Sequence, residues 1–99
     1  MNITKAPDGK KLKLALEGRL DTTTAPELQD ILIPAFAESN EIILDFSEIK
    51  YVSSAGLRVL LMAEKEATAK SASMTLCGVS DEVMEVFEMT GFADMLTIV

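Results

Sequence analysis

The sequence contains no histidine and no tryptophan, and it has a single cysteine, Cys77. Without an imidazole there is no general base that titrates near neutral pH, and no Ser-His-Asp or Cys-His pair. One cysteine cannot form an intramolecular disulfide, and in a chain without histidine it indicates no zinc site. We therefore expect no metal and no cofactor, interpret Cys77 as a small buried hydrophobic residue, and predict that the chain is not an enzyme.

Positive charge is also scarce. Nine Lys and Arg face sixteen Asp and Glu, which gives a formal net charge of −7. Phosphate binding needs clustered Lys and Arg, and base stacking needs more aromatic side chains than four Phe and one Tyr. No apolar run approaches the ~20 residues of a membrane span, and the first residues lack the pattern of a signal peptide. We expect a cytoplasmic protein with no nucleic-acid partner and no membrane span.

The length of 99 residues fits one domain, residues 1–99, because typical domains run to about 100–150 residues. Alternating polar and apolar residues predict a strand with one wet face over residues 11–17. The continuous apolar run over residues 41–46 predicts a central strand covered on both faces. In all, strands are expected around Ile3 and over residues 11–17, 41–46, 73–77 and 96–98.

A helix is expected after the second strand. We interpret Thr24 as its N-cap and Glu27 as the residue that completes a capping box. Pro34 lies inside the apolar stripe of this helix, where it removes a backbone hydrogen bond. The helix should therefore kink or break near Pro34.

Two more helices follow. The first begins at Ser53 or Ser54 and ends near residue 68, and the second is capped by Ser80 and stopped by Gly91. With the strands, the order becomes β-β-α-β-α-β-α-β. This order predicts a layered α/β fold with a largely parallel or mixed sheet.

Functional residues of such sheets usually lie in the loops that leave the carboxyl ends of the strands. Residues 18–24 and 47–54 form two such loops, and both lead into helices on the same side. Ser53 and Ser54 have two interpretations: one is a phosphoacceptor, because a helix N-terminus favours an added anion, and the other is a simple helix cap. On the first interpretation, Gly56 leaves the backbone open to a partner protein.

The loop over residues 18–24 also has two interpretations. Asp21, Thr22 and Thr23 either serve only as turn and cap residues, or form a polar surface that orients a serine hydroxyl or a partner's side chain. Asp45 stands alone at the end of a central strand, and a single carboxylate rarely holds a metal ion.

Residues 18–28, which begin Gly18-Arg19-Leu20-Asp21, resemble the first signature of the STAS domain, found in bacterial anti-sigma-factor antagonists. Residues 45–60, which include Ser53-Ser54-Ala55-Gly56-Leu57, resemble the second signature. The spacing and element order match along essentially the whole chain. The resemblance implies an α/β fold, a single STAS-like domain with a mixed sheet of about five strands and helices mainly on one face.

The resemblance also implies a function. In this family the unphosphorylated antagonist binds an anti-sigma factor, usually also a serine kinase, and so frees the sigma factor. Phosphorylation of a serine at the N-terminus of the second helix switches the antagonist off, and a serine phosphatase restores it. Aligning Gly56-Leu57 with the family motif puts that serine at Ser54, and Asp21 matches the acidic residue beside the phosphoacceptor.

One departure concerns the residue before the acceptor, which is often Asp and here is Ser53; this leaves Ser53 as a second candidate site. An alternative function is a STAS interaction module of another signalling or transport-associated complex. A small enzyme is the third hypothesis, opposed by the missing histidine. The expected partner-binding residues are Asp21, Thr22, Thr23, Ser53, Ala55, Gly56, Leu57 and Arg58.

Overall fold

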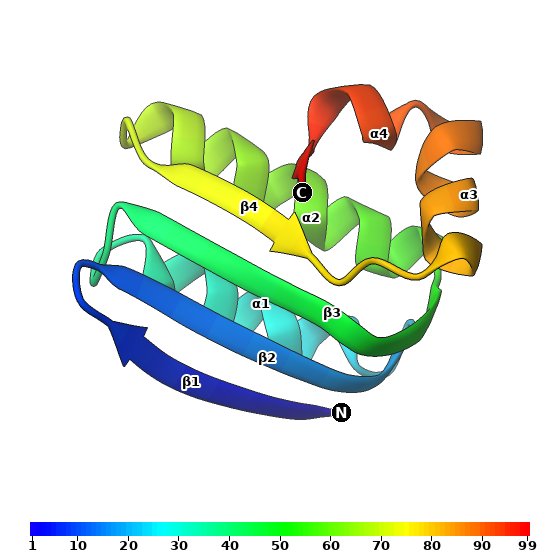
Figure 1. Ribbon diagram of the computed structural model, residues 1–99, viewed down its shortest axis with the longest axis horizontal. Coiled ribbons are helices and arrows are strands. Elements are labelled where there is room, and N and C mark those ends of the chain that lie inside the picture. Colours follow the sequence, from blue (N-terminus) through cyan, green and yellow to red (C-terminus); the bar gives the residue numbers. More distant parts are fainter.

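The computed structural model describes all 99 residues. Its five strands form one sheet in the order β1-β2-β3-β4-β5 (Figure 1). β1 runs antiparallel to β2, and every other neighbouring pair is parallel. The predicted mixed sheet of about five strands is confirmed. The strands are β1 (Asn2–Asp8), β2 (Lys11–Leu20), β3 (Glu41–Val52), β4 (Ser73–Cys77) and β5 (Thr97–Ile98).

The two longer helices cover one face of this sheet. Figure 1 shows α1 and α2 side by side behind the strands, and the two helices pack against each other. The opposite face carries no helix in the same view, so the prediction of helices mainly on one face is confirmed. The short α4 was not predicted. The helices are α1 (Ala25–Ala35), α2 (Ser54–Ala69), α3 (Asp81–Thr90) and α4 (Phe92–Met95).

The core lies between the sheet and the helices. On β3, Ile42 and Leu44 are buried, whereas Ile43 and Asp45, which point to the opposite face, are only half-buried. The prediction that this strand is covered on both faces is therefore wrong, because the helices lie on one face alone. Cys77 is likewise half-buried rather than buried, since it alternates with core residues of β4 and points to the uncovered face.

Both central strands are longer than the sequence predicts. β2 continues to Leu20 and β3 to Val52, so the start of the predicted loop 18–24 and most of the predicted loop 47–54 are strand. The pairing of β2 with β3 shifts register after Ala15 and again after Gly18. An extra residue in one strand breaks the strict alternation of side chains. For this reason the period-2 pattern fades before the strands end.

The helix ends follow the predicted signals closely. α1 ends at Ala35, one residue after Pro34, so the break near this proline is confirmed. The Ser80 hydroxyl oxygen accepts from the Val83 N–H at 3.3 Å and caps α3. Gly91 ends α3 with a φ of 82°, the left-handed conformation that glycine adopts most readily. None of the helices has both the length and the apolar character that crossing a membrane requires.

Candidate functional site

The carboxyl ends of β2 and β3 lie side by side and lead into α1 and α2. Leu20 pairs with Val52 in the sheet, and the Ser53 N–H donates to the Leu20 carbonyl at 2.8 Å. This bond ties the turn before α1 to the start of α2. The two segments that were expected to share one side of the sheet are therefore in contact.

The two serines at the start of α2 have different surroundings. Ser53 is the N-cap: it has extended backbone angles, it is half-buried, and its hydroxyl oxygen accepts from the Gly56 N–H at 3.3 Å. Ser54 is the first helical residue, it is exposed, and its hydroxyl makes no hydrogen bond. Since the cap occupies the Ser53 hydroxyl, the Ser54 hydroxyl is the free one.

Asp21 caps the turn that leads into α1. Its Oδ1 accepts from the Thr23 N–H at 3.0 Å, from the Thr23 hydroxyl at 2.7 Å and from the Thr24 N–H at 3.2 Å. In return, the Asp21 N–H donates to the Thr24 hydroxyl oxygen at 2.9 Å. The predicted capping box of Thr24 and Glu27 is wrong, since Thr24 makes no cap bond into α1 and its hydroxyl donates to the Arg19 carbonyl at 2.6 Å. The reciprocal pair lies one turn earlier, at Asp21 and Thr24.

These hydrogen bonds keep Asp21 charged. The Thr23 hydroxyl is the main cause that holds the pKa of the Asp21 carboxyl below its ordinary value, and the backbone N–H groups of Thr23 and Thr24 act in the same direction. Arg19 Nε lies 3.7 Å from Asp21 Oδ2. The structure contains no hydrogen bond between Asp21 and Ser54. Asp21 therefore stabilises the turn beside the start of α2 in its ionised form.

Gly56 and Leu57 are buried. A Cβ at Gly56 would lie 2.6 Å from the Leu20 side chain, so glycine here permits α2 to approach β2. The expectation that Gly56 opens the backbone to a partner is wrong, because Leu20 fills that space. Among the other expected partner-binding residues, Thr22, Thr23 and Arg58 are exposed, and Asp21, Ser53 and Ala55 are half-buried.

The sequence analysis missed a contact between Arg19 and Tyr51. The Arg19 guanidinium carbon lies 4.2 Å from the centre of the Tyr51 ring, and both side chains are exposed. They precede the buried residues Leu20 and Val52, so the alternation of side chains along a strand brings them to the same face. Extending the predicted strands by a few residues would have found the pair. Arg and Tyr are enriched among residues that dominate the energy of protein interfaces.

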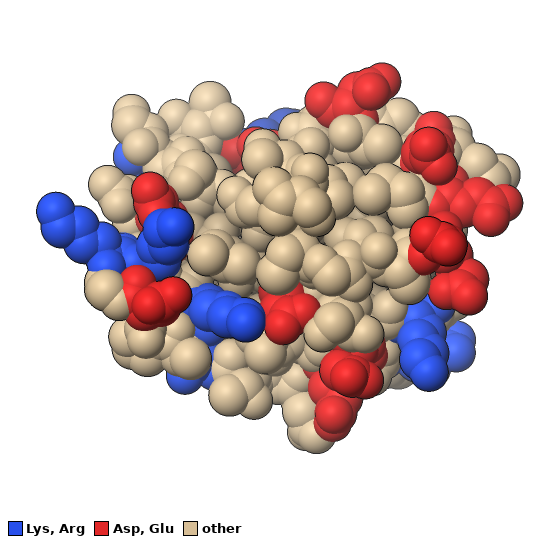
Figure 2. All heavy atoms as spheres, viewed as in Figure 1, with Lys and Arg blue, Asp and Glu red and all other residues tan.

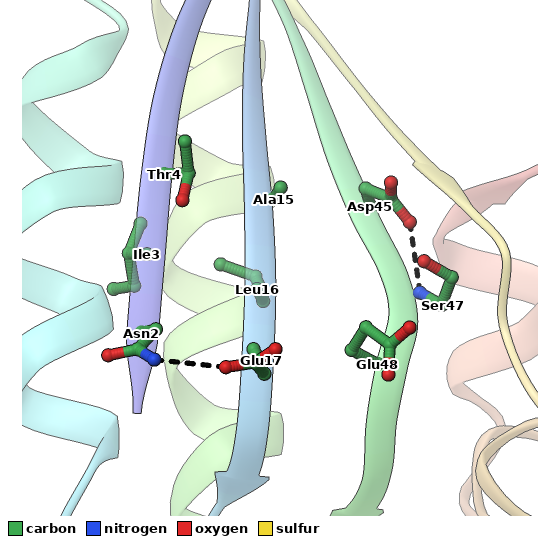
Figure 3. Close-up of a pocket in the computed structure, with 9 residues that line it drawn as sticks. All are labelled: Asn2, Ile3, Thr4, Ala15, Leu16, Glu17, Asp45, Ser47 and Glu48. Carbon is green, nitrogen blue, oxygen red and sulfur yellow. Dashed lines mark hydrogen bonds between the residues drawn. The ribbon is translucent and has the colours of Figure 1, made fainter.

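A shallow polar hollow of about 400 Å³ lies on the uncovered face of the sheet (Figure 3). Asp45 lines it, and the Ser47 N–H, which donates to Asp45 Oδ1 at 2.9 Å, is the main cause that lowers the pKa of this carboxyl. Lys13 Nζ lies 3.6 Å from Asp45 Oδ2. Glu17 points into the hollow and accepts from the Asn2 amide at 2.9 Å. Two hydrogen bonds thus join polar groups of the hollow, Asn2 to Glu17 and the Ser47 N–H to Asp45.

Comparison with known proteins agrees with this architecture. The family model described as "Mlab, STAS domain" matches residues 3–98. The anti-sigma-B factor antagonist of Listeria monocytogenes is 30% identical over 102 residues, which cover 99% of this chain and 90% of the relative. The chain therefore belongs to the STAS domain family.

Within that family, curated relatives from Listeria and Staphylococcus are anti-sigma-B factor antagonists. The prediction that the chain is not an enzyme agrees with their names, which describe antagonists of another protein. Two solved structures have the same fold. An anti-sigma factor antagonist from Mycobacterium paratuberculosis superposes with a TM-score of 0.87 at 15% identity, covering 98% of this chain and 83% of the other. The phosphorylated form of the Bacillus cell fate determinant SpoIIAA superposes with a TM-score of 0.75 at 18% identity, covering 99% and 91%.

Proposed function

We propose that this protein is an anti-sigma-factor antagonist that is switched off by phosphorylation of Ser54. The unphosphorylated form binds an anti-sigma factor that is also a serine kinase, and so frees the sigma factor in the cytoplasm. A serine phosphatase restores the active form. The observation that carries the proposal is the difference between two neighbouring hydroxyls: Ser53 caps α2, whereas Ser54 is exposed and makes no hydrogen bond.

The proposed switch needs no change of fold. A phosphate on Ser54 adds about −1.5 to −2 charges at neutral pH. It would lie at the N-terminus of α2, where the unpaired backbone N–H groups and the helix dipole favour an anion. The protein therefore accommodates the phosphate without a change of fold, and the phosphate alters the affinity for the partner.

For the partner, the same phosphate is unfavourable. Placing it in an interface costs desolvation and repels acidic groups of the other protein. A loss of ~2–4 kcal/mol weakens binding roughly 30- to 1000-fold. A charge of this size at the centre of a contact surface is sufficient for a switch.

The proposed contact surface surrounds Ser54. Gly56 and Leu57 contribute by fixing the position of α2 against the sheet, because both are buried. Ser53 contributes as the helix cap. The direct contacts come from the more accessible residues Asp21, Thr22, Thr23, Ala55 and Arg58.

The site assignment is tested with an anti-sigma-factor kinase purified from the same organism. The wild-type chain is incubated with this kinase and ATP, and mass spectrometry locates the phosphate. We expect it on Ser54. A matched Ser53→Ala variant should still be modified, and Ser54→Ala should not. Phosphate on Ser53 with Ser54 untouched would overturn the assignment.

A second candidate function follows from the description of the matching family model, which is that of Mlab rather than of a sigma-factor antagonist. In this case the chain is a STAS interaction module of another signalling or transport-associated complex. Phosphoserine at Ser54 without any binding to an anti-sigma factor would favour this second function.

A further inference from the structure

A largely apolar groove of about 410 Å³ lies between α2 and α4, away from the start of α2. Its α2 residues recur at intervals of three and four, so they form one stripe along the helix. This stripe lies beside the buried stripe of Leu60, Ala63 and Ala67, which packs into the core. The groove is lined by Leu61, Glu64, Lys65, Thr68, Ala69 and Met95.

Glu64 is the one acidic residue that lines this groove, and one of its carboxyl oxygens has no partner. Its Oε2 is buried and has no hydrogen-bond partner, and burial raises the pKa of its carboxyl above the ordinary value. The neighbouring Thr68 hydroxyl does not donate to Glu64 Oε2, because it donates its only proton to the Glu64 main-chain carbonyl at 3.0 Å. A buried acceptor without a donor is rare in folded proteins and destabilising. The isolated chain thus leaves Glu64 in need of a donor.

The groove also contains an unpaired cation. Lys65 is exposed and takes part in no ion pair of the structure. It cannot readily pair with Glu64 of its own chain, because adjacent residues on a helix do not face each other. One stripe therefore carries an unpaired carboxylate and an unpaired ammonium among apolar side chains.

We propose that this groove is the interface of a two-fold symmetric dimer, in which Glu64 of each copy pairs with Lys65 of the other. A two-fold axis brings the same patch of both copies together, so a patch that holds both charges of a pair complements itself. A foreign partner would have to supply both a cation for Glu64 and an anion for Lys65 in the matching positions. A second copy satisfies both groups at once.

Apolar side chains in and beside the groove supply the rest of the interface. Met62, which adjoins Leu61 on α2, and Met95 of the groove are 37% and 36% exposed, which is high for large hydrophobic side chains. Leu61 of the groove is half-buried. Burying these side chains favours association. The patch is small, so we expect a weak dimer with a dissociation constant on the order of micromolar or above.

The dimer is independent of the proposed switch. Glu64 lies ten residues beyond Ser54 on the same helix, which is about 15 Å along its axis. Association through the groove therefore does not require phosphorylation of Ser54. Failure of either proposal leaves the other intact.

The test is sedimentation velocity of the whole chain over a series of concentrations, with charge reversals in the groove. Glu64→Lys or Lys65→Glu alone places like charges against each other twice across the axis. Each variant should raise the dissociation constant of the homodimer about tenfold or more. Glu64→Lys also makes the acidic chain less negative, which by itself would strengthen self-association. A weaker dimer in this variant therefore reports the local charge pair and not the net charge of the chain.

Mixing the two variants gives the decisive result. Each copy then supplies the charge that the other lacks, so an equimolar mixture of Glu64→Lys and Lys65→Glu should form a heterodimer with about the affinity of the wild type. Glu85→Lys makes the same charge change at an exposed position of α3 and should leave the dimer unaffected. Circular dichroism checks that every variant is folded.

Three results would overturn the proposal. One is a wild-type chain that stays monomeric at the highest concentration. Another is a dimer that neither reversal weakens. The third is a dimer lost in the single variants and not recovered in their mixture, which would assign the contact to a different surface.

Discussion

At the scale of single residues, the two adjacent serines at the start of α2 have different roles. The cap position has extended backbone angles, which turn the Ser53 oxygen toward the N–H of Gly56. The next position is already helical and directs its side chain outward. Spacing in the sequence predicts that one of the two serines is the cap. It does not reveal which one, because that depends on where the strand before it ends.

Asp21 leads to a prediction about pH. The hydrogen bonds from Thr23 lower its pKa in the folded protein below 3.8, the value of an unperturbed Asp. Its contribution to stability is therefore present above about pH 3.8 and is lost as the pH falls through the folded-state pKa. We expect Asp21→Asn to be less stable than the wild type near neutral pH, and the difference to shrink at about pH 3. Urea unfolding at the two pH values measures both quantities.

Thr22→Ala is the matched control for this prediction. Thr22 lies in the same turn, is exposed and makes no hydrogen bond, so its replacement should change stability little at either pH. Asp45, whose pKa is also lowered, leaves the Asp21→Asn variant some residual acid sensitivity. A stability difference between Asp21→Asn and the wild type that stays constant from neutral to acid pH would contradict the role of the carboxylate.

The pair of Arg19 and Tyr51 gives a second prediction at this scale. Both side chains are exposed, so their mutual contact contributes only about 0.5–1 kcal/mol to folding. In an interface, however, truncation of Arg or Tyr often costs more than about 1 kcal/mol. Tyr51→Ala should therefore weaken anti-sigma-factor binding about fivefold or more while the melting temperature changes little. Equal affinities of wild type and variant would exclude this pair from the contact surface.

At the scale of elements, strand alternation and helix signals predicted where the elements lie. The leucines of β2, the break after Pro34 and the stop at Gly91 all follow from local rules. The ends of β2 and β3 could not be predicted in this way, since a register shift disturbs the alternation there. Thr24 is the N-cap of α1, as the sequence predicts, but its capping box does not form. The Thr24 hydroxyl bonds instead to the Asp21 N–H and the Arg19 carbonyl, which lie before the helix.

Contact between α2 and β2 yields a third prediction. A Cβ at Gly56 would come within 2.6 Å of Leu20 Cγ, so Gly56→Ala overpacks the start of the helix. We expect it to lower the free energy of unfolding by about 1–3 kcal/mol. Urea denaturation measures this change.

A double-mutant cycle separates the clash from any effect on the helix itself. Leu20→Ala removes the side chain that the new Cβ would meet, at an expected cost of about 2–5 kcal/mol. In that background, Gly56→Ala should cost much less than in the wild type. Additive costs would mean that the glycine is needed for another reason.

At the scale of the whole molecule, one face of the sheet stays open. The local apolar run over residues 41–46 predicted a strand covered on both faces, whereas the resemblance to the STAS domain implied helices mainly on one face. The expectation from the resemblance was right, because burial depends on how many helices the chain provides and where they lie. Figure 2 shows this open face with a largely uncharged centre, and with acidic side chains gathered at the end where α3 lies. Such a distribution follows from the arrangement of elements and cannot be read from a short segment.

The central claim is that the charge at Ser54 decides whether a partner binds, and it is tested by calorimetric titration of the anti-sigma factor from the same organism with three chains: wild type, Ser54→Ala and Ser54→Asp. Ser54→Ala should bind like the unphosphorylated wild type, because the exposed hydroxyl makes no hydrogen bond. Ser54→Asp should bind roughly 30- to 1000-fold more weakly, in line with a loss of ~2–4 kcal/mol. Equal affinity of Ser54→Ala and Ser54→Asp would contradict the account.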